Sequence, residues 1–229
     1  MIIYFVLVAP AVPENVGAAA RAINTMGFLN LRLVNPCDYL CTEAKKLAHG
    51  SVSILQNAEV FSSFDECIKD LDITIATTSK LRRTNYDYYT PSEVGHILQK
   101  KVNSVKKAGI IFGSEEHGLK NEYLRKCSFL SSIPMANPYP SLNLAQAVMI
   151  YAYCLSPYAS LQKIVPDKDD LHFPIVMQKI NMILDSIDIK SGSNLYTRIS
   201  ERLAVVNDDD LNLFSSVSTK MINKFLNKK

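Results

Sequence analysis

Short apolar runs, rich in β-branched residues and too short to form helices, limit most strongly how this chain can fold. They are IIYFVLVA (2–9), LRLV (31–34), ITIAT (73–77), GIIFG (109–113) and LSSIP (130–134). Stretches with helical spacing stand between most of them. Strands that are apolar on both faces and alternate with helices predict a mostly parallel sheet covered by helices on both sides. We therefore expect an α/β fold.

The spacing of apolar residues also predicts where the helices lie. The first covers about residues 15–26, and Gly27 is placed to end it. A second covers 64–71, and Pro91 begins a third. A further helix, almost wholly apolar, follows the sequence ANPYPSLN. A helix of this kind is buried or lies in a subunit interface.

The composition changes after Leu155. Residues 156–174 hold three prolines and a charged cluster, which is typical of a linker. Beyond it the spacing is purely helical, and the predicted apolar stripes are Val176, Ile180, Ile183 and Ile187; Leu195, Ile199, Leu203 and Val206; and Phe214, Val217 and Met221. We expect an α/β domain at 1–157, a linker at 158–172 and a small helical extension at 173–229.

The composition narrows the functional classes. A net charge of +3 permits a nucleic-acid partner without requiring one. The five cysteines are odd in number and form no C-x-x-C pair, which argues against a disulfide framework or zinc ribbon and for a reducing compartment. Residues 1–9 lack a basic segment before them and are too short to cross a bilayer. We expect a soluble, cytoplasmic protein without a membrane segment.

Three polar clusters interrupt the apolar framework at the edges of predicted strands, where ligands gather in open α/β sheets. The first, PENVGAAARAINTMGF (13–28), places Asn15 at a helix cap, and its small residues allow close packing on the first turn. Arg21 is the single basic residue of this helix. It suits binding of a phosphate or another anion, but a solvated or ion-paired surface arginine is the simpler interpretation.

The second cluster, GIIFGSEEHGLKNEYLRKC (109–127), leaves a buried strand through Gly113, turns at Glu115 and Glu116, and meets Gly118 before a short helix. Two glycines around one turn indicate close backbone approach, either to a ligand or to the neighbouring chain. The two glutamates are also explained by an exposed turn. His117 has no other His or Cys at ligand spacing, so we expect no metal site.

The third cluster is SLN, at the base of the apolar helix. Ser141 is explained adequately as a helix cap. Asn143 is not, because a polar group at the base of so apolar a helix needs a partner, from protein or ligand. Dinucleotide-binding, P-loop, serine-hydrolase and zincin motifs are absent from the sequence. The residues alone therefore predict an α/β ligand-binding domain with three candidate edges.

In this order, the clusters resemble the three signature motifs of the SPOUT superfamily, in its SpoU (TrmH-like) branch. ENVGAAARAINTMGF is similar to motif one, IIFGSEEHGL to motif two and SLNLAQAVMIYAY to motif three. The resemblance covers residues 2 to about 155. The helical tail and SLNLAQAV are most similar to the TrmJ-type tRNA 2′-O-methyltransferases, which modify the ribose of nucleotide 32 in the anticodon loop.

This resemblance implies a parallel sheet with a C-terminal trefoil knot, a homodimer formed through the knot region, and S-adenosylmethionine as methyl donor. It implies an RNA partner, with tRNA expected, and no metal. Carried over by position, the donor pocket contains Thr78, Ser79, Lys80, Gly113, Ile133, Ser141 and Leu142. The implied catalytic set is Arg21 beside the ribose, with Asn15, Glu115, Ser141 and Asn143 orienting the ribose and the arginine.

RNA contacts are expected beside the donor pocket. Arg82 and Arg83, followed by the aromatic run 85–90, combine phosphate contact with base stacking. For the lysine pairs 100–101 and 106–107 a solvated surface is the preferred interpretation. Two alternatives stay open: an rRNA 2′-O-methyltransferase of the same family, disfavoured because the first strand starts at Ile2 and leaves no N-terminal RNA-binding extension, and a catalytically silent, knotted RNA-binding protein.

Overall fold

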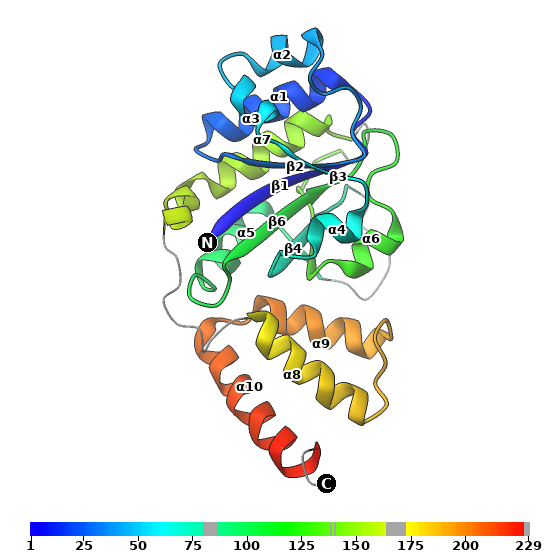
Figure 1. Ribbon diagram of the computed structural model, residues 1–229, viewed down its shortest axis with the longest axis vertical. Helices are drawn as coiled ribbons and strands as arrows, with labels where there is room; N and C mark the ends of the chain where they lie inside the picture. The colour runs from blue at the N-terminus through cyan, green and yellow to red at the C-terminus, as the bar shows by residue number, and fades with distance from the viewer. Residues whose placement is uncertain (80–86, 138, 140, 164–172, 227–229) are drawn as a thin grey trace.

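In the part of the chain that the structure describes, the protein is built on one seven-stranded parallel sheet, followed by helices at the C-terminal end (Figure 1). The computed structural model describes residues 1–79, 87–137, 139, 141–163 and 173–226. The strands are β1 (Ile2–Val8), β2 (Asn30–Val34), β3 (Glu59–Phe61), β4 (Ile73–Thr77), β5 (Tyr88–Tyr89), β6 (Lys107–Phe112) and β7 (Phe129–Ser131). Their order in the sheet is β3-β2-β1-β6-β4-β7-β5, and all the strand pairs are parallel.

Helices join these strands and form the tail. They are α1 (Pro13–Thr25), α2 (Thr42–Ala48), α3 (Val52–Gln56), α4 (Phe64–Ile68), α5 (Pro91–Gln99), α6 (Asn121–Lys126), α7 (Leu144–Leu155), the 3-10 helix η1 (Ser156–Lys163), α8 (Phe173–Ser186), α9 (Asn194–Val205), α10 (Asp208–Met221) and the π-helix η2 (Ile222–Leu226). All five predicted strands and the predicted parallel sheet are confirmed. The two short strands β3 and β5 and the helices α2 and α3 were not predicted as elements of their own, whereas the short helix predicted after Gly118 is found as α6.

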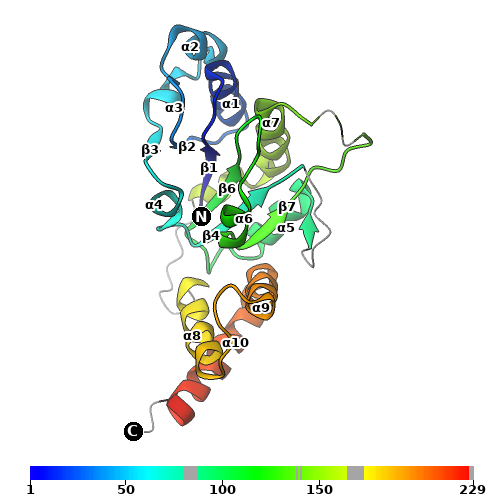
Figure 2. The same ribbon diagram turned by 90° about the vertical axis from the view of Figure 1, so that its right-hand side faces the viewer.

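The alternation of side chains along β1 divides the core into two layers. Ile3, Phe5 and Leu7 face a cluster covered by α1, α2, α3, α5 and α7, whereas Tyr4 and Val6 face a smaller cluster covered by α4 and α6. Figures 1 and 2 show the sheet between these two helical layers. The expected burial on both faces is therefore found.

Two glycines, Gly17 within α1 and Gly27 after it, set how closely this helix packs and where it ends. A Cβ on Gly17 would overlap the backbone of Ala44, so α2 is what packs on the small residues of the first turns. Gly27 adopts φ +84° and ends the helix, and the Phe28 amide donates back to the Ile23 carbonyl at 3.0 Å. The predicted end of α1 is thus confirmed, although the helix starts two residues earlier than predicted.

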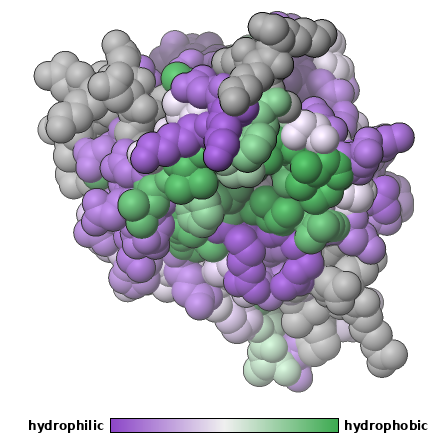
Figure 3. All heavy atoms as spheres, turned by 90° about the horizontal axis from the view of Figure 1, so that it is seen from below, coloured by the Kyte–Doolittle hydropathy of each residue, from purple (hydrophilic) through white to green (hydrophobic). Residues whose placement is uncertain are grey.

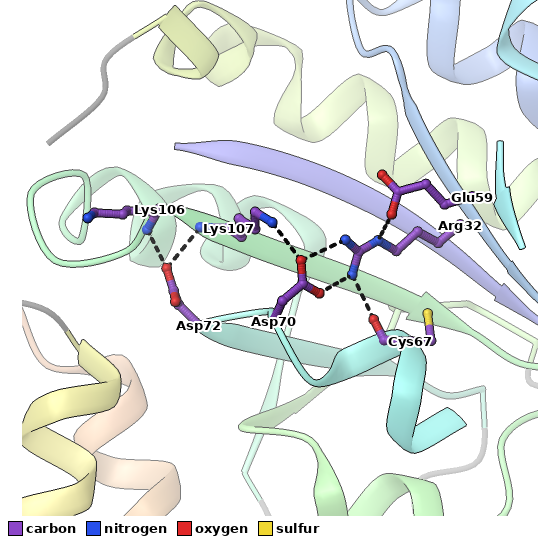
Figure 4. A network of polar contacts seen from close by, with 7 residues as sticks. All are labelled: Arg32, Glu59, Cys67, Asp70, Asp72, Lys106 and Lys107. Carbon is purple, nitrogen blue, oxygen red and sulfur yellow. Dashed lines mark hydrogen bonds and ion pairs between the residues drawn. The ribbon is translucent and has the colours of Figure 1, made fainter. Parts of the chain in front are cut away.

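A buried arginine ties the outer strands to α4 (Figure 4). Arg32 on β2 is 2% exposed, and its guanidinium donates to both carboxylate oxygens of Asp70, at 2.7 and 3.0 Å, and to the Cys67 carbonyl at 2.7 Å. It also pairs with Glu59 and lies 4.0 Å from the ring centre of Tyr4. The hydrogen bonds from Arg32 hold the pKa of Asp70 well below its usual range.

The tail packs under the sheet domain and against the end of α5 (Figure 2). Phe173 donates its amide to the Ser104 carbonyl at 2.8 Å, and the Asn103 amide donates to Asp208 at 3.1 Å. Lys101 is fully buried between these contacts, with Nζ 3.4 Å from the Leu203 carbonyl and 4.6 Å from the centre of the Phe173 ring. The interpretation of this lysine as solvated surface is therefore wrong.

The buried side of the tail follows the prediction in part, since Val176 and Leu203 of the predicted stripes are buried. The residues that join the main core are Phe173, Val176, Ala204 and Leu211, while Ile187, Leu195, Phe214, Val217 and Met221 are exposed. In α10, which packs on α8, the buried residues are Leu211 and Ser218, so the predicted stripe Phe214, Val217 and Met221 faces outward. Figure 3 shows apolar side chains gathered on the face seen from below.

The predicted linker begins inside a helix. Ser156–Lys163 forms η1, and Tyr158 packs against Gly95 and places its hydroxyl 3.1 Å from His96 Nδ1. Residues 164–172 lie outside the described part. Among the described residues, none of the helices has the length and apolarity needed to span a bilayer. The division into 1–157, 158–172 and 173–229 stays a proposal.

Candidate active site

The three polar clusters predicted from the sequence meet at one point. The side-chain amide of Asn15 donates to Glu115 Oε1 at 2.8 Å, and the side-chain amide of Asn143 donates to Asn15 Oδ1 at 2.8 Å. Glu115 follows β6, Asn15 lies in the first turn of α1, and Asn143 precedes α7. One hydrogen-bonded chain therefore joins the ends of three elements that are distant in the sequence.

Backbone amides complete the environment of Glu115. Ala11 donates to Oε2 at 3.0 Å and Val12 donates to Oε1 at 3.3 Å. Partial burial by itself would raise the pKa of this carboxyl, but these hydrogen bonds and the one from Asn15 outweigh it and lower the pKa. The ionised carboxylate thus lies beside the N-terminus of α1, where the free amides and the helix dipole favour negative charge.

Asn143, and not Ser141, caps the apolar helix. Its Oδ1 accepts the Ala145 amide at 2.8 Å, while Gln146 accepts the amide of Asn143 at 3.1 Å, which makes a reciprocal capping box. The predicted cap at Ser141 is wrong because the helix begins at Leu144. Asn15 is likewise not a cap, since α1 already begins at Pro13 with Val12 before it. The partner that Asn143 requires is Asn15.

Beside this chain of hydrogen bonds lies a cavity of about 970 Å³, at the carboxyl ends of β4, β6 and β7. All the described residues predicted for the donor pocket line it: Thr78, Ser79, Gly113, Ile133, Ser141 and Leu142. Lys80, Arg82 and Arg83 lie outside the described residues. The carboxyl edge of the sheet is where the sequence placed the ligand site.

The cavity combines apolar walls with polar rims. Phe112, Leu144, Ala147 and Tyr151 provide the apolar side, and Glu115 lines the rim. Tyr151 is 1% exposed, and its hydroxyl lies 2.6 Å from Ser131 Oγ. Burial raises the pKa of this phenol, so it stays neutral. A volume near the upper end of the range for small-molecule sites can hold a cofactor-sized ligand.

Gly113 has a local role in shaping this cavity. A Cβ at this position would overlap the backbone of Gly118 and Leu119, and the Gly118 amide donates to the Ser114 carbonyl at 2.9 Å. The close backbone approach predicted for the two glycines is therefore an approach of the turn to itself. The turn closes so tightly that Gly113, Ser114 and Glu115 all face the cavity.

Within one chain, Arg21 does not lie beside the hydrogen-bonded residues Glu115, Asn15 and Asn143. It lies six residues after Asn15 on α1, which is a rise of about 9 Å and a rotation of about 240°. It is exposed, it does not line the cavity, and it has no ion-pair or hydrogen-bond partner in the described part of the chain. Within a single chain, Arg21 is therefore a solvated surface arginine, the simpler of the two interpretations given above.

Several lining residues were not assigned to the pocket from the sequence, among them Thr77, Tyr88, Thr90, Ser132 and Tyr139. Tyr88 and Thr90 belong to the aromatic run predicted to contact RNA, and the strand there is only two residues long, so no periodicity marks it. His117 and Glu116 stand at the rim, 3.7 Å apart. In the residues that the structure describes, no three His, Cys, Asp or Glu side chains form a group able to hold a metal.

A comparison of the sequence with protein families assigns the chain to one family. The model of the SpoU rRNA Methylase family matches residues 2–153. The chain belongs to this family. It is therefore an RNA methyltransferase of the SpoU type with the SPOUT fold. The threading of the knot itself stays a prediction.

Named relatives extend the similarity beyond the motifs. The chain is 36% identical over 211 residues to LasT of Escherichia coli K12, named an uncharacterized tRNA/rRNA methyltransferase, with 92% of each chain covered. It is 39% identical over 157 residues to TrmJ of Methanocaldococcus jannaschii, named a tRNA (cytidine-2′-O-)-methyltransferase, and this match covers 67% of the present chain and 66% of that protein.

The similarity to solved structures extends into the helical tail. The crystal structure of TrmJ from Z. mobilis ZM4 superposes with a TM-score of 0.66 at 25% identity, covering 96% of this chain and 99% of that one. Two SpoU-type or rRNA methyltransferases, 18% and 21% identical, were solved with AdoMet and share the fold.

Proposed function

We propose that this protein transfers a methyl group from S-adenosylmethionine to a ribose 2′-hydroxyl of tRNA, at nucleotide 32 of the anticodon loop. The observation that carries the proposal is the meeting of Glu115, Asn15 and Asn143 at the rim of the 970 Å³ cavity. The names of the TrmJ relatives favour tRNA as substrate.

The cavity suits this donor in the chemistry of its walls. S-adenosylmethionine has an aromatic base, a polar ribose and a charged amino-acid part, and it needs apolar walls beside hydrogen-bonding groups. Ile133 and Leu142 supply apolar walls, Thr78, Ser79 and Ser141 supply polar atoms, and Gly113 lines the wall between them. We assign Lys80 to the same pocket from its place in the sequence. When bound, the donor supplies an electrophilic methyl carbon.

The remaining task is to prepare the 2′-hydroxyl. This hydroxyl is a poor nucleophile, so its proton must leave and its developing charge must be stabilised. Arg21 can stabilise the charge and bind the neighbouring phosphate, but a guanidinium gives up its proton too reluctantly to act as base. The transfer is a displacement at one carbon, so much of the rate enhancement comes from positioning.

Glu115, Asn15 and Asn143 act in this proposal by orientation. Three hydrogen bonds already fall on the Glu115 carboxylate, and its lowered pKa makes it a weak base. It holds the loop before α1, and through Asn15 it holds Asn143. Ser141, at the mouth of the cavity, orients the ribose in the same proposal.

We further propose a homodimer formed through α7 and the neighbouring α1. Tyr153 on α7 is 66% exposed, and α7 packs against α1, the helix that carries Arg21. A partner chain bound on the exposed side of these two helices would come next to Arg21. Arg82 and Arg83 are proposed to contact the RNA phosphates.

The test uses purified protein, labelled S-adenosylmethionine and bulk tRNA, followed by nuclease digestion and mass spectrometry of the product. We expect a new 2′-O-methyl nucleoside at position 32, and loss of transfer in Arg21→Ala with the dimer still present by light scattering. Label in rRNA and not in tRNA would support methyl transfer to a ribose but would show that rRNA, and not tRNA, is the substrate. Donor binding without any transfer would favour the silent RNA-binding protein.

A further inference from the structure

The tail helix α9 reaches the wall of the cavity through one residue, Asp87. Glu201 Oε1 accepts the backbone amide of Asp87 at 3.0 Å, and the guanidinium of Arg202 lies 2.6 Å from the Asp87 carboxylate. These two contacts are made by consecutive residues of α9 to the backbone and the side chain of the same residue. Asp87 is thus held from both sides by the tail.

Asp87 directly precedes β5, the last strand at one edge of the sheet. An edge strand of two residues has little of its own to hold it in place. It pairs with β7 only, and Ser131 Oγ donates to the Tyr89 carbonyl at 2.6 Å while the Ser132 amide donates to the same carbonyl at 3.0 Å. The tail therefore supports the free end of this strand.

The same strand forms part of the cavity. Tyr88 and Thr90 line it, and so do Ser132 and Tyr151, which are joined to β5 through the Tyr89 carbonyl and Ser131. A displacement of Asp87 would move the Tyr88 wall directly. The path from α9 to the cavity is short, because Glu201 and Arg202 contact Asp87 directly and Asp87 is the residue before Tyr88.

Burying the carboxylate of Glu201 costs free energy of folding, and attachment of the tail alone does not require it. It is 3% exposed, and burial raises the pKa of its carboxyl. Apolar packing and the separate contacts of Phe173 and Asp208 already join the tail to the domain. The buried carboxylate of Glu201 instead serves as the acceptor for the Asp87 amide, directly before β5.

We propose that Glu201 and Arg202 are positioning residues for the donor cavity, acting through Asp87 and the edge strand β5. The proposal gives the helical extension a role in the reaction besides any contact with RNA. It rests on the proposed function in so far as the cavity binds S-adenosylmethionine. The link between tail and cavity stands on the contacts alone.

The test compares Glu201→Ala with Glu201→Gln, which keeps the acceptor oxygen, and with Asp209→Ala, which removes an exposed tail charge that has no contact with β5. Binding of S-adenosylmethionine by calorimetry and amide exchange of Tyr88, Thr90 and Ser132 are measured on the full chain. We expect Glu201→Ala to weaken donor binding about tenfold and to speed exchange at these amides by a similar factor. The other two variants stay near wild type.

Unchanged donor binding and unchanged exchange in a folded Glu201→Ala protein would overturn the proposal, as would faster exchange with unchanged binding. If Glu201→Ala does not fold, Arg202→Gln replaces it, because the side chain of Arg202 is 57% exposed and leaves no buried gap. If the wild type itself binds no S-adenosylmethionine, the proposed function fails, and the link between tail and cavity is then decided by exchange at Ser132.

Discussion

Asn15 and Asn143, 128 residues apart in the chain, share a 2.8 Å hydrogen bond that joins the first turn of α1 to the cap of α7. Each amide is used twice. Asn15 also donates to Glu115, and Asn143 also accepts the Ala145 amide. Since both side chains have fixed partners on each end, their orientation at the rim of the cavity is set before any ligand binds.

Substitutions at Asn143 can separate its two roles. Asn143→Asp keeps the oxygen that caps α7 but loses the donor to Asn15, whereas Asn143→Ala loses both. We expect Asn143→Ala to lower the free energy of unfolding by about 1–2 kcal/mol. Asn143→Asp is expected to retain most of that stability and still lose methyl transfer. Denaturant unfolding and the labelled-donor assay measure the two effects, and full activity in Asn143→Asp would show that the bridge is not needed.

The hydrogen bonds to Glu115 predict a pH dependence. Its pKa is lowered in the folded protein from the ordinary 4.5, so its contribution to stability is present above that value and is lost as the pH falls through the folded pKa. Glu115→Gln should therefore be less stable than wild type at pH 7, by about 1 kcal/mol after allowance for solvent screening, and equal to it in acid. Unfolding curves of both proteins between pH 7 and the acid transition check this, and a constant difference at all pH values would contradict it.

The sequence predicted the sheet and the edge at which the site lies because long apolar strands and motif residues carry strong local signals. Two-residue β5 carries none, so Tyr88 was not assigned to the cavity. Lys101 was misread because its burial depends on tail helices that are distant in sequence. The resemblance named Asn15, Glu115 and Asn143, but that they bond to one another required the packed structure.

The two glycines of the turn after β6 are expected to differ in their tolerance of a side chain. Gly113→Ala places a Cβ into the backbone of Gly118, so it should cost about 3 kcal/mol or more and abolish donor binding. Gly118→Ala has open space around it and φ +65°, so it should cost about 1–2 kcal/mol. Thermal unfolding and calorimetric donor binding of this matched pair would test the difference, and equal losses would count against the steric role of Gly113.

The buried Arg32 network predicts a large effect on stability without an effect on the site. Arg32→Met leaves Asp70 with Lys107 as its remaining partner and leaves the Cys67 carbonyl without its donor, so it should lower the free energy of unfolding by about 2–3 kcal/mol. Lys126→Ala, which breaks the exposed pair with Asp65, is the matched control and should change little. Urea unfolding measures both, and a stable Arg32→Met protein would show that apolar packing replaces the network.

Replacing Lys101 is expected to stabilise the protein, in contrast to replacing Arg32, because burial of the Lys101 ammonium lowers the free energy of unfolding. Burial lowers its pKa to about 8 from 10.5, so between these values the unfolded chain binds more protons than the folded one, and stability rises with pH. Lys101→Met removes the buried charge and keeps a long apolar side chain, so at pH 7 it should be more stable than wild type by about 2–3 kcal/mol, a gain that disappears as the pH approaches 10.5. The exposed neighbour Lys100→Met is the control and should show no such trend. If Lys101→Met is less stable at pH 7, the contacts of the ammonium with the Leu203 carbonyl and the Phe173 ring outweigh the cost of its burial.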